Sequence, residues 1–141
     1  MKKLIYILGV LIVLTACNQT EKKPEKTIAE LESELFSEDA VLDEGSRKKA
    51  EELVQAYLDF ARENPEDPAS PEYLFKAGNV AMNMYMSQVA IDCFNKIIVK
   101  YPGYEKAPES LFLVAYIFEN QLQNFGKAKE LYEEVYCARG D

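Results

Sequence analysis

The chain has 141 residues, a formal net charge of −8 and no histidine. Because histidine is the commonest general base, zinc ligand and partner of a nucleophilic serine or cysteine, its absence excludes most catalytic designs, and we predict neither enzymatic activity nor a catalytic, cofactor or metal site. Acidic residues outnumber basic residues by 16 to 7 between Asn18 and Glu72 and by 8 to 7 from Tyr73 onward, so the sequence offers no basic surface for nucleic acid.

The N-terminus has the pattern of a secretory signal peptide. Lys2 and Lys3 precede the apolar run Leu4–Leu14, and small residues follow before position 17. The run has 11 residues, fewer than the roughly 20 that span a bilayer as a helix. We therefore predict a signal-peptide helix within residues 1–16, which is removed from the mature chain, rather than a retained transmembrane segment.

The segment Leu14-Thr15-Ala16-Cys17 resembles the bacterial lipobox. This resemblance implies that Cys17 is diacylated and becomes the first residue of a mature chain of 125 residues. Two or three acyl chains, at about 0.8 kcal/mol per buried CH₂, make such an attachment effectively permanent. Asn18 stands where well-studied lipoproteins retained in the inner membrane have Asp, so the resemblance favours the outer membrane, facing the periplasm. The alternative is an ordinary signal peptide with a cysteine present by chance.

Residues 17–45 form a predicted acidic tether that contains one short helix. Residues 18–26 are polar and include a proline, which suits a flexible linker. Ile28, Leu31 and Leu35 recur at helical spacing among glutamates and predict an amphipathic helix over about residues 27–36. Residues 37–45 have the composition of a loop, and they lack the alternating ligands of a calcium-binding EF-hand.

Residues 46–141 form one predicted domain of helices whose ends are marked by capping residues and prolines. The expected markers are, in chain order, Ser46 as a cap, Asn64-Pro65 as a stop, Ser70-Pro71 as a start with Ser70 capping, Tyr85 as an approximate end, Ser87 as a cap, Tyr101-Pro102 as a stop, Pro108 as a start and residues 124–127 as a turn. The apolar run Leu111–Phe118 is predicted to be a helix covered nearly all round by its neighbours.

One residue pattern occurs three times in this domain, and its copies are Leu53, Tyr57, Phe60 and Pro65, then Ala90, Phe94, Ile97 and Pro102, then Ala128, Tyr132 and Val135. The offset in residue number is 37 between the first two copies (102 − 65) and 38 between the second and the third (128 − 90). A fixed period of this size indicates stacked helical hairpins, because one hairpin cannot bury its apolar face alone. The predicted fold class is therefore an all-α solenoid.

Gly78, Ala90, Phe94 and Pro102 are 12, 4 and 8 residues apart, and this spacing resembles the tetratricopeptide repeat. The resemblance covers about residues 46–137 and implies two to two and a half repeats. In the second copy Ala115 replaces the glycine and the final proline is absent. The period exceeds the usual one of about 34 residues, so the chain resembles longer-period envelope proteins such as the Tol-Pal-associated periplasmic coordinator and the lipoprotein of the outer-membrane β-barrel assembly machine.

The resemblance implies a protein-binding or scaffold role, because the first helix of each hairpin lines a concave groove in this family. The groove positions that it implies are Phe75, Asn79, Met82, Asn83, Phe112, Tyr116, Glu119 and Asn120. Aromatic and amide side chains suit an extended peptide or a partner helix, here from an unidentified envelope protein. None of these positions is basic, unlike the clamp of the family's chaperone-binding members. The alternative is that several of them pack against the next hairpin.

A metal-handling or enzyme-accessory lipoprotein is the competing hypothesis. Met82, Met84 and Met86 could supply thioethers to Cu(I). Core packing is favoured, because methionines commonly fill gaps and Met82 and Met86 would share one helical face. The adjacent pairs Glu51-Glu52 and Glu133-Glu134 are predicted to lie on solvated helical faces rather than to act as an acid and base.

Two cysteines follow the lipobox, Cys93 and Cys137. They could pair in an oxidising envelope, but the sequence favours two free thiols, with Cys93 half buried. Because solenoids need polar caps, the last helix should leave Leu131 or Val135 partly uncovered, which allows self-association through that helix.

Overall fold

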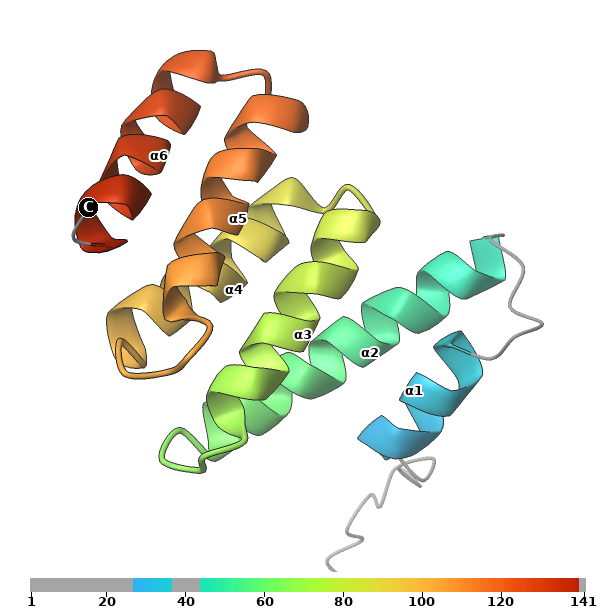
Figure 1. The fold of residues 1–141 in the computed structure, drawn as a ribbon. Coiled ribbons are helices and arrows are strands. Elements are labelled where there is room, and N and C mark those ends of the chain that lie inside the picture. The colour runs from blue at the N-terminus through green and yellow to red at the C-terminus, as the bar shows by residue number, and fades with distance from the viewer. Residues whose placement is uncertain (1–26, 37–43, 140–141) are drawn as a thin grey trace, which may run out of the picture.

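The structure is a computed structural model that describes residues 27–36 and 44–139, with side chains up to residue 137. Its elements are α1 (Ile28–Leu35), α2 (Glu44–Glu63), α3 (Ser70–Asn83), α4 (Ser87–Lys100), α5 (Ala107–Asn120) and α6 (Phe125–Arg139), as Figure 1 shows. These described residues contain six helices and no strands, which confirms the predicted all-α class. The signal peptide, Cys17, the polar linker and residues 37–43 of the predicted loop lie outside the described residues.

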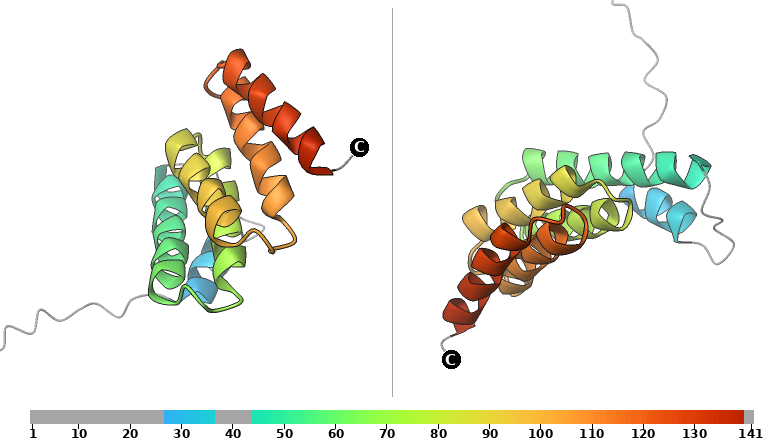
Figure 2. Two further views of the ribbon diagram at one scale, coloured as in Figure 1. Left: turned by 90° about the vertical axis from the view of Figure 1, so that its left-hand side faces the viewer. Right: turned by 90° about the horizontal axis from the view of Figure 1, so that it is seen from above.

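The helices pack chiefly against their neighbours in sequence, each joined to the next from α1 to α6. Figure 2 shows the result as a curved array, with α2 at one side, α6 at the other and α1 lying against α2. Among the described residues, no helix combines the length and the apolar character needed to cross a bilayer.

The backbone repeats with the predicted spacing. Helices α3 and α5 each have 14 residues. The offset between them is 37 at their starts (107 − 70) and at their ends (120 − 83), whereas the offset between the starts of α4 and α6 is 38 (125 − 87). Tyr85 and Gln123, which differ by the same 38 (123 − 85), have a left-handed backbone, with φ angles of 58° and 52°. The extra residue of the second repeat therefore lies after α5 and before this left-handed position.

A close approach between α3 and α4 organises the centre of the core. Phe94 is fully buried, and its ring lies edge-on to Phe75 at a centroid distance of 5.8 Å. Gly78 faces the same ring, and a Cβ at this position would lie 2.6 Å from Phe94 Cε1. The absence of a side chain at Gly78 therefore lets the two helices meet around the phenyl ring. Ala115, the equivalent residue of α5, is also fully buried.

Three predicted serine caps are wrong. The Ser70 hydroxyl donates to the carbonyl of Asn64 at the end of α2. The Ser87 hydroxyl donates to Gln121 Oε1 at 2.7 Å, between the two hairpins. Ser46 is the third residue of α2 rather than the residue before it. Ser70 and Ser87 are the first residues inside α3 and α4, after the cap positions Ala69 and Met86, so neither stands where a side chain caps the helix start.

Two other helix starts are capped by side chains. The hydroxyl of Thr27 accepts from the Glu30 amide, and Glu30 accepts in return from the Thr27 amide, which makes a capping box at α1. Asn124 Oδ1 accepts from the Lys127 amide at 3.1 Å at the start of α6. The short helix predicted over residues 27–36 is confirmed. The turn predicted at residues 124–127 lies earlier, because α6 already begins at Phe125.

Burial differs from the prediction at several positions. Helix α5 is not covered all round, because Phe112 and Tyr116 are each 41% exposed on one side of it. Cys93 is fully buried rather than half buried, since it belongs to the face of α4 that enters the core. Cys137 is exposed, and both cysteines are free thiols in the structure. Leu131 is partly uncovered as predicted, whereas Val135 is buried.

Candidate binding grooves along α3

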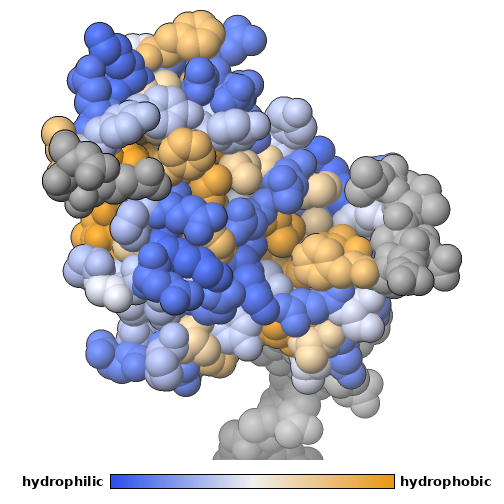
Figure 3. Space-filling view, viewed as in Figure 1, coloured by the Kyte–Doolittle hydropathy of each residue, from blue (hydrophilic) through white to orange (hydrophobic). Residues whose placement is uncertain are grey.

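The larger of two hollows along α3 lies between α3 and α1, has a volume of about 710 Å³ and is here called the α1–α3 groove. Its lining comprises Ala29, Glu32, Ser33, Phe36, Tyr57, Glu72, Phe75, Lys76, Asn79, Val80, Asn83 and Lys106. Apolar side chains share this lining with two carboxylates, two lysines and two amides. Figure 3, drawn from the side of Figure 1, shows apolar and hydrophilic side chains interspersed over this face of the molecule.

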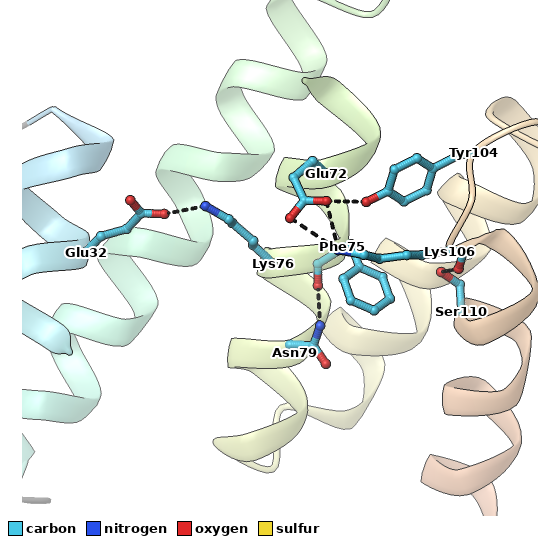
Figure 4. Close-up of polar contacts among 8 residues, drawn as sticks. All are labelled: Glu32, Glu72, Phe75, Lys76, Asn79, Tyr104, Lys106 and Ser110. Carbon is cyan, nitrogen blue, oxygen red and sulfur yellow. Dashed lines mark hydrogen bonds and ion pairs between the residues drawn. The ribbon is translucent and has the colours of Figure 1, made fainter. Parts of the chain in front are cut away.

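Glu32 joins α1 to α2 and α3 at one wall of the α1–α3 groove. Its Oε1 accepts hydrogen bonds from Tyr57 Oη at 2.7 Å and from Lys76 Nζ at 2.8 Å. The bond from Lys76, followed by that from Tyr57, lowers the pKa of Glu32 below its ordinary value of 4.5. The same bond to Glu32 raises the pKa of Lys76. Both groups therefore carry their charges near neutral pH and compensate each other (Figure 4).

Glu72 forms a second junction, between α3 and the turn before α5. It accepts hydrogen bonds from Tyr104 Oη and, at 3.1 Å, from Lys106 Nζ. These contacts, with that from Tyr104 the largest, lower the pKa of Glu72. Lys106 Nζ also lies 4.8 Å from the centroid of the Phe75 ring (Figure 4), within the range of a cation–π contact. Both lysines in the groove are thus neutralised by carboxylates of this chain.

The second hollow lies between the end of α3 and α5, has a volume of about 360 Å³ and is here called the α3–α5 groove. Its lining comprises Met82, Asn83, Tyr85, Phe112, Leu113, Tyr116 and Gln121. Gln121 Nε2 donates to the carbonyl of Met82 at 2.8 Å, which holds the end of α5 against the end of α3. Asn83 lines both hollows, so the two grooves adjoin at this residue.

Six of the eight predicted groove residues line these hollows. Phe75, Asn79 and Asn83 line the α1–α3 groove, and Met82, Asn83, Phe112 and Tyr116 line the α3–α5 groove. Glu119 is oriented toward α6 instead, where it accepts a hydrogen bond from Tyr132 Oη at 2.8 Å. Asn120 is exposed and donates to the carbonyl of Tyr116.

Phe75 lies mostly in the core, with 8% of its surface exposed. Phe75 therefore serves mainly to pack against a neighbouring helix, which is the alternative role, whereas Tyr116 is 41% exposed. Asn79 donates to the carbonyl of Phe75 at 3.0 Å, which leaves its carbonyl oxygen and its second amide proton for a ligand.

Sequence reasoning missed the charged residues of the groove, Glu32, Glu72, Lys76 and Lys106. Lys106 precedes α5, outside the first-helix positions that the tetratricopeptide resemblance implies. Lys76 follows Phe75 directly, but its partner Glu32 is 44 residues away on α1. Only the packing of α1 against the repeats brings these two side chains together, and no local spacing indicates it.

The three methionines fill space at the turn between α3 and α4. Helix α3 ends at Asn83, so the prediction that Met82 and Met86 share one helical face is wrong. Met82, Met84 and Met86 are each partly buried against the core, which favours core packing over a copper site.

The acidic pairs lie at the surface. Glu51, Glu52, Glu133 and Glu134 are all exposed, which confirms the predicted solvated faces. Over residues 27–36 and 44–139, no three His, Cys, Asp or Glu side chains gather where they could hold a metal ion.

Residues 1–18 match the family model of the prokaryotic membrane lipoprotein lipid attachment site. Cys17 is the only cysteine in that segment. The match supports a lipoprotein that is anchored in the bacterial cell envelope through lipid on this cysteine. No curated protein and no solved structure shows significant similarity to the chain.

Proposed function

We propose that this lipoprotein is a protein-binding scaffold module, in which tetratricopeptide-like hairpins hold a partner in the two grooves along α3. The observation that carries the proposal is that the grooves adjoin at Asn83, which gives one surface from α1 to α5. Surfaces of this kind bind peptides and helices through anchoring side chains surrounded by weaker contacts.

The chemistry of the surface favours non-covalent recognition of an extended peptide or a helix. The lysines and carboxylates of the α1–α3 groove are paired with each other, so they make a rim of compensated charge rather than a site for a free ion. The exposed aromatic area comes from Phe36, Tyr85, Phe112 and Tyr116, which are 64%, 78%, 41% and 41% exposed. Asn79 and Asn83 supply amides that can pair with the backbone of a partner.

The partner is an envelope protein, because the lipid on Cys17 holds the grooves close to a membrane. We place the module at the outer membrane, facing the periplasm, because Asn18 rather than Asp follows the acylated cysteine. In this position the module would hold its partner near the membrane without catalysing a reaction.

Site-specific photocrosslinking in intact cells tests this proposal. A photoreactive amino acid at position 83, where both grooves meet, should give a discrete adduct with one envelope protein after membrane solubilisation. The matched control is position 99 on α4, because Val99 is 77% exposed and lines neither groove. Equal yields of the same adducts from the two positions would contradict the proposal.

Alanine substitutions give a second measurement on the same surface. Tyr116→Ala should weaken capture of the crosslinked partner while leaving the helical circular dichroism unchanged, because Tyr116 is partly exposed. Phe75→Ala is a poor probe, because loss of a buried phenyl ring costs about 3–5 kcal/mol of folding stability. Undiminished capture by a Tyr116→Ala, Phe112→Ala variant would exclude the α3–α5 groove as the binding surface.

A further inference from the structure

Helices α5 and α6 present an aromatic face that no described element covers. Tyr132 joins the two helices there, because its ring lies 5.5 Å from that of Phe112 and its hydroxyl donates to Glu119. Phe125 and Tyr136 lie on the same side of α6 and are 66% and 68% exposed. A shallow hollow of about 250 Å³ lies among these α6 residues, and its lining is mostly apolar.

The first hairpin shows what such a face accommodates. By the offset of the repeat, Phe75, Ile91 and Phe94 of α3 and α4 are the equivalents of Phe112, Lys129 and Tyr132. The three residues of the first hairpin are all buried, and α5 packs against α4 as the next helix in sequence. The corresponding face of α5 and α6 therefore has the form that receives a helix in the first hairpin, and it lies open in the described residues.

The order of side chains on α6 identifies the helix that fits. Phe125, Lys129, Glu133 and Tyr136 follow one another at spacings of 4, 4 and 3 residues, which places them in one stripe on the helix. The stripe is apolar, basic, acidic and apolar in turn. Its two charged side chains are exposed and also form an ion pair within the helix, with Lys129 Nζ 3.8 Å from Glu133 Oε1. When two such stripes run antiparallel about a two-fold axis, Phe125 lies opposite Tyr136 and Lys129 lies opposite Glu133 of the other copy.

We propose that two copies of this lipoprotein associate through their α6 stripes, antiparallel and related by a two-fold axis. A self-complementary patch is what a symmetric dimer requires, and the opposed charges fix the register. Lys129 stands where the first hairpin has the buried Ile91, which suits a contact made between separate molecules better than a core.

The lipid anchor makes a small interface sufficient. A single pair of helices buries less surface than the roughly 1,200–2,000 Å² of a stable complex, so the contact is weak in dilute solution. Anchoring on one membrane confines both copies to a thin layer and raises their effective concentration. Association therefore responds to the surface density of the lipoprotein.

Energy transfer between labelled copies in lipid vesicles tests the proposal with the acylated full chain. The exposed Cys137 takes the donor or the acceptor dye, and the buried Cys93 does not react in the native state. Energy transfer should rise with lipoprotein density in the wild type. No transfer beyond the level of random proximity, at any density, would overturn the proposal.

Charge reversal on the stripe checks the register. Lys129→Glu and Glu133→Lys should each raise the density at half-maximal transfer by about tenfold. Each sets like charges opposite one another across the interface, besides breaking the Lys129–Glu133 ion pair within the helix. The double variant should restore the wild-type curve. The matched controls are Lys127→Glu and Glu130→Lys, because these residues form an ion pair at 3.1 Å on another side of α6. They should leave the density at half-maximal transfer unchanged. Failure of the double variant to recover, with α-helical content intact, would overturn the proposed pairing.

Discussion

Gly78→Ala is the substitution whose effect the structure defines most sharply. The added Cβ would lie 2.6, 2.7 and 3.0 Å from three carbons of the Phe94 ring, whereas carbon atoms in contact are separated by about 3.5–4.0 Å. The ring cannot move freely, because Phe94 is fully buried and packs edge-on against Phe75. Overpacking of this kind costs about 1–3 kcal/mol, and the gain in helix propensity returns up to about 1 kcal/mol.

We therefore expect Gly78→Ala to lower the free energy of unfolding by up to about 2 kcal/mol. Gly126→Ala is the matched control, because the nearest atom to its Cβ is 3.8 Å away and the residue is exposed in the first turn of α6. The control should be neutral or stabilising by up to about 1 kcal/mol.

Urea unfolding followed by far-ultraviolet circular dichroism measures both values, on the full chain carrying Cys17→Ser to avoid the lipid. A smaller side chain in Phe94→Leu should relieve the clash, so Gly78→Ala should cost less in that background than in the wild type. If Gly78→Ala is as stabilising as Gly126→Ala, the close approach of α3 and α4 is refuted.

Further predictions concern the junctions and the cysteines. Glu32→Gln should speed hydrogen–deuterium exchange of the α1 amides, because Glu32 accepts the bonds from Tyr57 and Lys76, while the amides of α4 stay protected. Unchanged exchange in α1 would contradict the role of Glu32 in anchoring this helix. The folded state lowers the pKa of Glu32 and Glu72 below the ordinary value of 4.5. Both carboxylates therefore stabilise the fold above about pH 4.5, and this stabilisation is lost as the pH falls through their lowered pKa values. The Glu32→Gln, Glu72→Gln variant should therefore lose less unfolding free energy than the wild type as the pH falls from about 5 to 3. Parallel plots of unfolding free energy against pH for the two proteins would argue against these junctions. Burial raises the pKa of Cys93 to about 11, so a thiol reagent at about pH 8 should modify only Cys137 in the native chain, in contrast to two thiols in urea. Cys17→Ser should accumulate unprocessed precursor, and normal maturation would refute lipidation there.

The helices were predictable because their ends depend on local residues. Pro71 and Pro108 lie in the first turns of α3 and α5, where a missing amide proton costs nothing. Pro65 and Pro102 follow the ends of α2 and α4 within two residues, since proline cannot continue a helix. The repeat could be recognised because the same local constraints recur at one period.

The candidate binding surface was less predictable, because it depends on contacts between residues distant in sequence. Ser87 has the side chain of a good helix cap, yet it is the first residue inside α4, and its hydroxyl donates to Gln121 on the next hairpin. Phe75 and Phe112 occupy equivalent positions, but Phe75 is buried and Phe112 is 41% exposed, because among the described residues only Phe75 has a following hairpin beside it. Periodicity identifies the face of a helix on which a residue lies, and the neighbouring elements decide its exposure.

The Glu32 junction gives the molecule a defined route for mechanical force. Cys17, at the lipid attachment site, is ten residues before Thr27, so a pull on the anchor would enter the described structure through α1. Helix α1 has eight residues and is held to α2 and α3 by the bonds that Tyr57 and Lys76 donate to Glu32. Leu31 of α1 is also buried in the core, so apolar packing adds to these bonds. Because α1 also lines the α1–α3 groove, we expect a pull on the anchor to reach that groove before it reaches α4 to α6.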